Sequence, residues 1–188
     1  DAEAEERLPR TPAGEPMQRR SSVGYVPVGD PALPVVGLRG VDAWAFCRWL
    51  GPGWRLPHDQ EWEKAARGTD ARPLPWGTHD EPTWTRIAAS VRPPALAPVD
   101  ALVHDVGPYD VRGMAGNASD WCANPFDRDG PTDGSRVIPV ASPNPGLTNV
   151  RGGYFLGGTG SVWLATRLAA DLDRRLSGTS LRPVRSVN

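Results

Sequence analysis

The residues of this chain that could support metal or thiol chemistry are few and widely spaced. The three histidines, His58, His79 and His104, fall on different expected elements, and no second histidine or cysteine stands at the spacing of a metal site. A zinc or other catalytic metal centre is therefore not expected. Of the two cysteines, Cys47 and Cys122, the first falls on the apolar face of an expected helix, so we interpret it as a buried thiol and not as a nucleophile.

Two groups of carboxylates have the residue types of a catalytic or calcium site but not the spacing. Glu61 and Glu63 are two positions apart on an expected helix and point to different faces, which favours capping or solvated roles over an acid–base pair. Asp127, Asp129 and Asp133 provide hard oxygen ligands, but the residue order of an EF-hand and its distal Glu are missing. We interpret that segment as a polar turn.

The glycine-rich run and the serines also lack the partners that catalysis needs. Gly157-Gly158-Thr159-Gly160 is not followed by Lys-Ser/Thr or by a clear helix start, as a phosphate loop would be. No serine stands in a Gly-x-Ser-x-Gly elbow. The sequence therefore supports neither a phosphate-binding nor a hydrolase function.

Length and charge narrow the class of protein further. A chain of 188 residues is long enough to form one domain whose core needs no metal or disulfide. Its 21 basic and 22 acidic residues give a net charge of -1, which argues against binding to nucleic acid or a membrane surface through charge. No apolar run is long enough to span a membrane. Two cysteines exclude a disulfide-dense scaffold and favour a cytoplasmic location.

The elements expected to position these residues are two helices, short strands and much irregular loop. Helices are expected at 41–50, which Gly51 ends, and at 55–68, where Gly68 is the stop. Short strands are expected at the two ends of the stretch 149–185, and 69–111 is expected to be loop. Residues 1–22 are poor in apolar side chains and are expected to be a disordered or linker segment, which leaves 23–188 as the domain.

Several of these segments resemble a known family when they are taken in chain order. They are Pro34-Val35-Val36, Asp42 to Leu50, Arg55 to Gly68, Pro75-Trp76-Gly77, Asp110 to Asn117, Val150 to Gly153 and Leu181 to Arg185. Together they resemble the formylglycine-generating-enzyme-like (sulfatase-modifying factor) domain, which implies an α+β fold of the C-type-lectin type. The opening strand and first helix of that family have no clear counterpart here.

The resemblance also indicates where oxidase chemistry would be located. The oxidase branch of the family carries two cysteines shortly after its Arg-Gly-Gly, which bind copper and react as thiolates. The matching positions here are Gly157 and Val162, and no cysteine follows Cys122. The related sulfoxide synthases take iron-binding histidines from an additional helical domain, which is not expected in this chain. The chain is therefore not expected to be an enzyme.

The branch that remains comprises the variable proteins of diversity-generating retroelements, whose C-terminal segment is rewritten by an adenine-mutating reverse transcriptase. By this resemblance, residues 151–185 form a hypervariable, ligand-binding region that binds a protein or another exposed macromolecule. We name its twelve expected variable positions the contact positions. They are Tyr154, Leu156, Gly158, Ser161, Trp163, Thr166, Leu168, Asp171, Asp173, Arg174, Leu176 and Ser177.

Some points stay open at this stage. Some family members hold calcium near the Gly-Asn turn, which corresponds to Asn117 and Asp120, and no other cofactor is expected to be required. Phe155 and Trp163 also fit core positions, and for Trp163 the core and contact interpretations carry equal weight. A non-catalytic, lectin-like sensory or accessory domain of a larger signalling protein is the alternative function, and a relative of the formylglycine-generating oxidases is the less favoured one.

Overall fold

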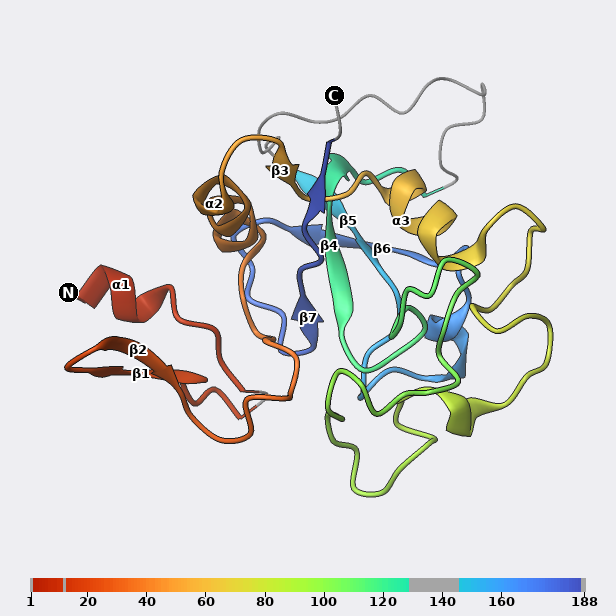
Figure 1. The fold of residues 1–188 in the computed structure, drawn as a ribbon, viewed down its shortest axis with the longest axis horizontal. Helices are drawn as coiled ribbons and strands as arrows, with labels where there is room; N and C mark the ends of the chain where they lie inside the picture. Colours follow the sequence, from red (N-terminus) through yellow and green to blue (C-terminus); the bar gives the residue numbers. More distant parts are fainter. Residues whose placement is uncertain (1, 12, 129–145, 187–188) are drawn as a thin grey trace.

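A four-stranded sheet forms the centre of the protein (Figure 1). The computed structural model describes residues 2–11, 13–128 and 146–186. The strands of the sheet are β4 (Ser119–Pro125), β5 (Leu147–Arg151), β6 (Arg167–Asp171) and β7 (Thr179–Ser180). Their order is β6-β5-β4-β7; β5 runs antiparallel to both β4 and β6, whereas β7 pairs parallel with β4. The α+β class expected from the sequence is confirmed.

Two helices, α2 (Gly40–Leu50) and α3 (Asp59–Arg67), pack on opposite faces of this sheet. Successive residues of a strand point to opposite faces, so neighbours on β4 belong to different clusters of buried side chains. Trp121 belongs to the cluster that contains α2, and Cys122 belongs to the cluster that contains α3. The sheet is therefore buried on both sides at its centre.

The helices agree with the sequence pattern, except at one boundary. α2 matches the helix expected at 41–50, whereas α3 begins later than the helix expected at 55–68. Arg55, the first of those residues, instead belongs to β3 (Trp54–Arg55), which pairs antiparallel with β8 (Val184–Arg185). A distant strand partner thus overrode the helical pattern at Arg55, and His58 is the N-cap before the first residue of α3. No helix within the described residues is long and apolar enough to cross a membrane.

α3 is capped by side chains at its N-terminal end and ends at a glycine. The Glu61 carboxylate accepts a hydrogen bond from the His58 backbone N–H (2.9 Å), and the His58 ring nitrogen accepts one from the Gln60 N–H (3.3 Å). These reciprocal bonds satisfy donors that a helix N-terminus leaves unpaired. Gly68, with φ 73, ends the helix.

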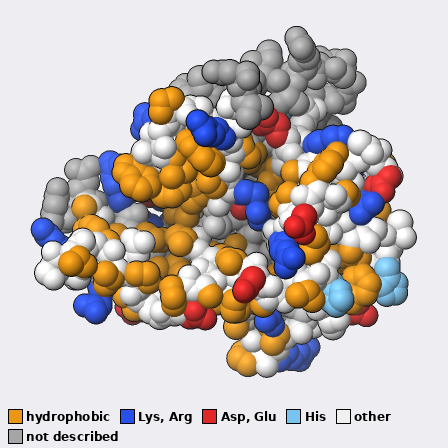
Figure 2. Space-filling model, viewed as in Figure 1, with side chains coloured by type: hydrophobic (Ala, Val, Ile, Leu, Met, Phe, Trp, Pro, Cys, Tyr) orange, Lys and Arg blue, Asp and Glu red, His pale blue; other side chains and the backbone are white. Residues whose placement is uncertain are grey.

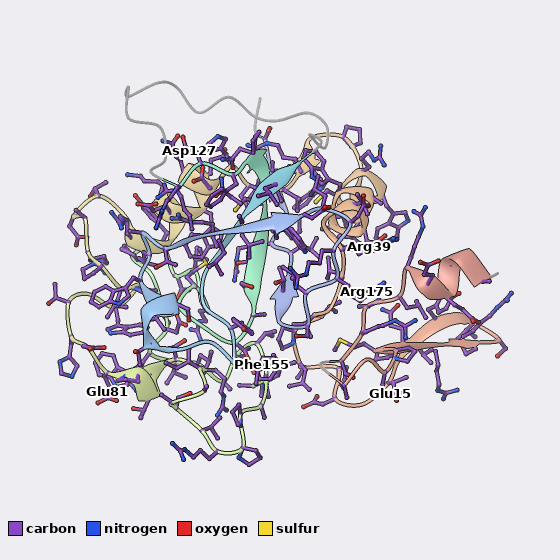
Figure 3. All side chains as sticks on the ribbon, turned by 180° about the vertical axis from the view of Figure 1, so that it is seen from behind. Glu15, Arg39, Glu81, Asp127, Phe155 and Arg175 are labelled. Atoms are coloured by element: carbon purple, nitrogen blue, oxygen red, sulfur yellow. The ribbon has the colours of Figure 1, made fainter. Side chains whose placement is uncertain are left out.

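The N-terminal segment differs from the expectation of a disordered or linker stretch over 1–22. It contains α1 (Ala2–Glu6) and β1 (Gln18–Ser21), and β2 (Gly24–Pro27) follows it. β1 and β2 form a hairpin. The Arg175 guanidinium donates to the carbonyl oxygens of Glu6 (2.6 Å) and Leu8 (3.0 Å), and Figure 3 shows Arg175 between this segment and the sheet. Hydrogen bonds from a distant arginine thus provide contacts that the apolar-poor sequence did not predict.

The segment between α3 and β4 is largely irregular, apart from the 3₁₀ turn η1 (Pro82–Trp84). The buried Asp105 carboxylate accepts hydrogen bonds from the Thr85 hydroxyl (2.6 Å) and from two backbone N–H groups farther along the loop. The turn expected at Gly116-Asn117 is present, because Asn117 has φ 70. These contacts hold a long loop against the sheet.

Candidate functional site

The 151–185 stretch begins with Arg151, which is buried at the end of β5. Arg151 is 0% exposed; its Nη2 donates to the Leu164 carbonyl oxygen (2.6 Å) and to the Glu63 carboxylate. Its guanidinium also lies over the Trp62 ring, 5.2 Å from the ring centroid, in cation–π geometry. Burial lowers the pKa of Arg151, and the Glu63 carboxylate acts against that effect. Arg151 is thus an anchor of the scaffold.

The two glycines that follow Arg151 are required by backbone geometry. Gly152 has φ 78, a conformation that favours glycine, and a Cβ there would also lie 2.9 Å from the Met114 carbonyl oxygen. A Cβ at Gly153 would overlap the Ala115 carbonyl oxygen. The Arg-Gly-Gly motif therefore lets the chain leave the sheet directly against the 114–115 loop.

An ionic cluster joins β5 and β6 to α3. Arg151 and Arg167 are register partners on β5 and β6, so two like charges lie side by side. Glu63 accepts hydrogen bonds from both, at 3.2 Å from Arg167 Nη2, and Asp59 Oδ2 accepts from Arg167 Nε at 2.8 Å. Glu61 caps the helix, as the sequence predicts. Glu63 is not a solvated side chain, because it pairs with two arginines. The side chains of Glu61 and Glu63 do point to different partners, as expected.

All twelve contact positions lie in the described part of the chain, and none of them is buried. Eight are exposed, namely Leu156, Gly158, Trp163, Leu168, Asp171, Asp173, Arg174 and Ser177. Tyr154, Ser161, Thr166 and Leu176 are half-buried. The buried side chains of the same stretch are others, such as Phe155, Val162, Leu164, Ala170 and Leu172. The stretch therefore separates an outer set of side chains from an inner set that packs in the core.

The structure also distinguishes Phe155 from Trp163. Phe155 is 3% exposed and is a core residue, as one of the two sequence interpretations held. Trp163 is 42% exposed and lies directly after the 3₁₀ turn η2 (Thr159–Val162). A tryptophan that is this exposed offers a large apolar surface to a partner. In Figure 3, seen from behind, Phe155 lies below β6.

Three contact positions also stabilise local turns. The Ser161 hydroxyl donates to the Gly158 carbonyl oxygen (2.7 Å), and the Thr166 hydroxyl donates to the Gly160 carbonyl oxygen (3.2 Å). The Asp171 carboxylate accepts from the Asp173 N–H (2.8 Å) after β6. Substitution at these three positions would therefore change local backbone structure as well as the surface.

Four contact positions, Tyr154, Leu168, Leu176 and Ser177, surround one hollow of about 250 Å³. Ser119 and Thr179, from the ends of β4 and β7, also line it. Local sequence patterns did not predict that these residues lie around one hollow, because strand register and the 172–178 loop bring them together.

A larger groove of about 650 Å³ lies beside α2. Apolar side chains gather over α2 and border this groove (Figure 2), among them Phe46 and Val35, which are both 41% exposed. None of the twelve contact positions lines the groove, but Asn117 and Asp120 do. The predicted contact surface and the predicted calcium residues thus belong to different depressions.

Asn117 and Asp120 are already bonded to protein groups. The Asn117 side-chain oxygen accepts from the Ala97 N–H (2.9 Å), and Asp120 Oδ2 accepts from Trp62 Nε1 (2.9 Å) and Arg182 Nε (3.1 Å). Within the described residues, no group of three or more His, Cys, Asp and Glu side chains could hold a metal ion. In this arrangement the pair does not fit a calcium ion, which needs several free oxygen ligands. Asp129 and Asp133 lie outside the described residues.

The positions that match the oxidase thiols do not fit copper either. Gly157 has no side chain, and Val162 is 5% exposed and packs with Leu74 and Ile87. Cys47 and Cys122, the cysteines present in the chain, are both buried, and burial raises the pKa of Cys47 to about 11. A deprotonated, accessible thiol, which copper binding and thiolate chemistry both need, is therefore disfavoured at either cysteine.

In sequence, the chain matches one protein-family model and several known proteins. The sulfatase-modifying factor enzyme 1-like domain matches residues 9–187. The inactive C-alpha-formylglycine-generating enzyme 2 of Mus musculus is 35% identical over 106 residues, which are 50% of this chain and 33% of that protein. The formylglycine-generating enzyme of Thermomonospora curvata is 33% identical over 143 residues, 67% of this chain and 46% of that protein. The chain thus spans only about a third to a half of these relatives.

Two further similarities concern a modular relative and the fold. A serine/threonine-protein kinase pkn1 of Chlamydia caviae is 30% identical over 115 residues, 60% of this chain and 17% of the kinase. Among solved structures, PvdO from Pseudomonas aeruginosa has a TM-score of 0.69 at 21% identity, covering 86% of this chain and 66% of PvdO. Treponema denticola variable protein 1 has a TM-score of 0.63 at 18% identity, covering 81% and 70%. These similarities confirm the expected fold.

Proposed function

This chain belongs to the sulfatase-modifying factor enzyme 1-like domain family, and from that premise we propose that it is a non-enzymatic ligand-binding member. The ligand surface is the outer side of the 151–185 stretch, and the ligand is a protein or another exposed macromolecule. The family includes relatives named as formylglycine-generating enzymes and relatives named as inactive. The residues at the site of this chain therefore have to indicate whether it is of the enzymatic or the inactive kind.

One observation carries the proposal: none of the twelve contact positions is buried, whereas the side chains of the same stretch that pack in the core stand at other positions. Surface substitutions usually change stability little, so such a stretch can alter what it binds without unfolding its scaffold. Gly157 and Val162 at the oxidase thiol positions support a binding role over an oxidase.

The finer proposal is that the stretch is diversified by a retroelement. It is supported by the similarity in fold to Treponema denticola variable protein 1. Residues 151–188 also contain no Lys, Glu, Gln or Met, which substitution of adenines in Asn codons cannot give; Trp163 would have to come from a different template codon. The test is the DNA of the locus. We expect a near-copy of the codons for this stretch, differing only at adenines, beside a reverse-transcriptase gene, and a locus with neither would overturn retroelement diversification.

The absence of oxidase activity has its own test. The purified chain is titrated with copper(I) and assayed for oxygen uptake with a cysteine-containing peptide, with the Thermomonospora curvata enzyme as the positive control. We expect neither copper binding nor oxygen uptake above the protein-free background. Stoichiometric copper binding together with peptide-dependent oxygen uptake would establish an oxidase instead.

The pkn1 relative favours a second candidate, a sensory or accessory domain of a larger signalling protein, because the match covers 17% of that kinase. The two candidates differ in variability between copies. Near-identical residues from Tyr154 to Ser177 among sibling genes of one genome would favour the accessory domain, whereas differences confined to the contact positions would favour the diversified surface.

A further inference from the structure

We propose that the hollow beside β6 and β7 captures a single tyrosine side chain of a partner protein. This inference rests on the proposed ligand surface and names how that surface holds its partner. The hollow is formed by four contact positions together with strand residues that belong to the scaffold. The contact positions would set which partner fits, and the scaffold would supply a constant floor.

The size and lining of the hollow limit its occupant to one uncharged side chain. Its volume of about 250 Å³ is below the roughly 300–1,000 Å³ of pockets that hold drug-sized ligands. Val150, Leu168 and Leu176 make its walls apolar, and none of the described residues that line it is charged. A charged side chain would lose its hydration without gaining a counter-ion. An apolar body of side-chain size is therefore favoured.

The polar groups at the strand ends indicate whether the tip of that side chain should donate or accept a hydrogen bond. Ser119 and Thr179 are 2% and 3% exposed, and their hydroxyl oxygens are 3.0 Å apart. Either hydroxyl could donate to the other; when Ser119 Oγ donates to the Gly178 carbonyl oxygen, at 3.4 Å, the proton between the two hydroxyls comes from Thr179. Thr179 Oγ1 makes no other hydrogen bond recorded within the described residues, which leaves it a free acceptor. The occupant's tip should therefore be a donor.

One wall of the hollow is held in place before any ligand binds. A Cβ at Gly178 would overlap the Tyr154 ring, and a Cβ at Gly157 would lie 3.2 Å from Tyr154 Cδ1. The ring thus lies against two glycines, and it also contacts Phe155 edge-on at 6.2 Å between centroids. Because this wall is ordered in advance, binding loses less side-chain entropy.

Tyrosine meets all three requirements, because it combines a flat apolar ring, no charge at neutral pH and a terminal O–H that donates. Phenylalanine lacks the donor, and serine lacks the apolar body. Tryptophan has a donor on a larger ring and is therefore an alternative for the experiment to separate from tyrosine.

The test uses analogues of the side chains as probes. The full chain is titrated with p-cresol, toluene or 3-methylindole, and backbone amide shifts are followed by NMR. We expect p-cresol to shift the amides of residues 154, 168 and 176–179, and to bind roughly two- to tenfold more tightly than toluene, the value of one hydrogen bond. Absence of these shifts, equal affinity for toluene, or tighter binding of 3-methylindole would each overturn the tyrosine assignment.

Matched variants test whether the Thr179 hydroxyl causes the preference for p-cresol over toluene. Thr179→Val removes the hydroxyl at nearly constant shape and should equalise the affinities for p-cresol and toluene. Thr159→Val, in the same stretch but outside the hollow, should leave the wild-type preference unchanged. Leu168→Trp should fill the hollow and abolish binding of both probes. Circular dichroism melts establish that each variant folds, and an unaltered p-cresol preference in folded Thr179→Val would overturn the proposal.

These outcomes are separate from those of the proposed function. Probe binding does not depend on the genomic locus or on oxidase assays. If the locus carries the template copy but p-cresol does not bind, only the tyrosine inference fails. If p-cresol binds at a locus without a template copy, retroelement diversification fails and the hollow remains a binding site.

Discussion

Asp59 shows at the scale of one residue how burial and ion pairing oppose each other. Burial alone would raise the pKa of its carboxyl group, but the contacts of the carboxylate with His58 and Arg167 outweigh burial and lower the pKa from 3.8 to about 2. Because the folded-state pKa lies below the unfolded value, the ionised carboxylate stabilises the fold above about pH 4, and this contribution is lost as the pH falls toward about 2.

Asp59→Asn tests this linkage. The variant should be less stable than the wild type at neutral pH, and the difference in the free energy of unfolding should shrink by about 2 kcal/mol as the pH falls through that window. Urea denaturation at a series of pH values measures it. A difference that stays constant with pH would show that the Asp59 carboxylate is not the group that titrates.

The two cysteines give a second prediction at this scale. Burial raises the pKa of Cys47 to about 11 and that of Cys122 well above its usual value of 9.0. Since the thiolate is the reactive form, we expect iodoacetamide to modify neither thiol in the folded protein at mildly alkaline pH, and to modify both in urea. Mass spectrometry of the native and unfolded protein follows the reaction. Fast modification of the native protein would contradict the burial of either thiol.

Calcium provides a third test, at Asn117 and Asp120. An ion there would have to displace the bonds from Ala97, Trp62 and Arg182. We therefore expect the melting temperature to be the same in excess calcium and in EDTA. A rise in melting temperature that depends on calcium concentration would establish the site that the family resemblance implies.

At the scale of elements, α3 holds β5 and β6 together through charge. Arg151 and Arg167 would repel each other across the register without the Glu63 carboxylate between them. Glu63→Gln should lower the free energy of unfolding by about 3–5 kcal/mol, the usual loss when a buried charge loses its partner. Thermal or urea unfolding measures this loss.

Glu61→Gln on the same helix is the matched control. Glu61 caps the helix and pairs with Arg55 in a more exposed position, so its loss should cost only about 1 kcal/mol. Equal losses for the two variants would show that the buried cluster contributes no more than an ordinary surface pair.

For the whole molecule, the outer and inner side chains of the 151–185 stretch should differ in their tolerance to substitution. Alanine at Leu156, Arg174 or Ser177 should change the free energy of unfolding by no more than about 0.5 kcal/mol. Alanine at Phe155 or Leu164 should cost about 2–5 kcal/mol, because both side chains are buried. Denaturant unfolding of the five variants measures this; a large loss at the three outer positions would contradict a replaceable surface.

Much of the local structure was predictable because it depends on neighbouring residues. The caps of α3, the stop at Gly68 and the turn at Asn117 follow from side chains and backbone preferences within a few positions. Arg55 was placed in the helix and lies instead in β3, because its strand partner Val184 comes from the far end of the chain. The contacts of the N-terminal segment with Arg175 were missed for the same reason.

The sequence by itself determined what the protein can contain: no thiol after Cys122, two helices that end at glycines, and the Arg-Gly-Gly and Leu-Arg-Pro-Val-Arg segments that bound the stretch. Only the tertiary structure decided which side chains meet. Glu63 reaches Arg151 across 88 positions, and Thr179 meets Ser119 across 60. The packing of α3 on the sheet sets the first contact, and strand register sets the second; both depend on the assembly of the whole sheet. The ionic cluster and the hollow therefore could not be predicted from local sequence patterns.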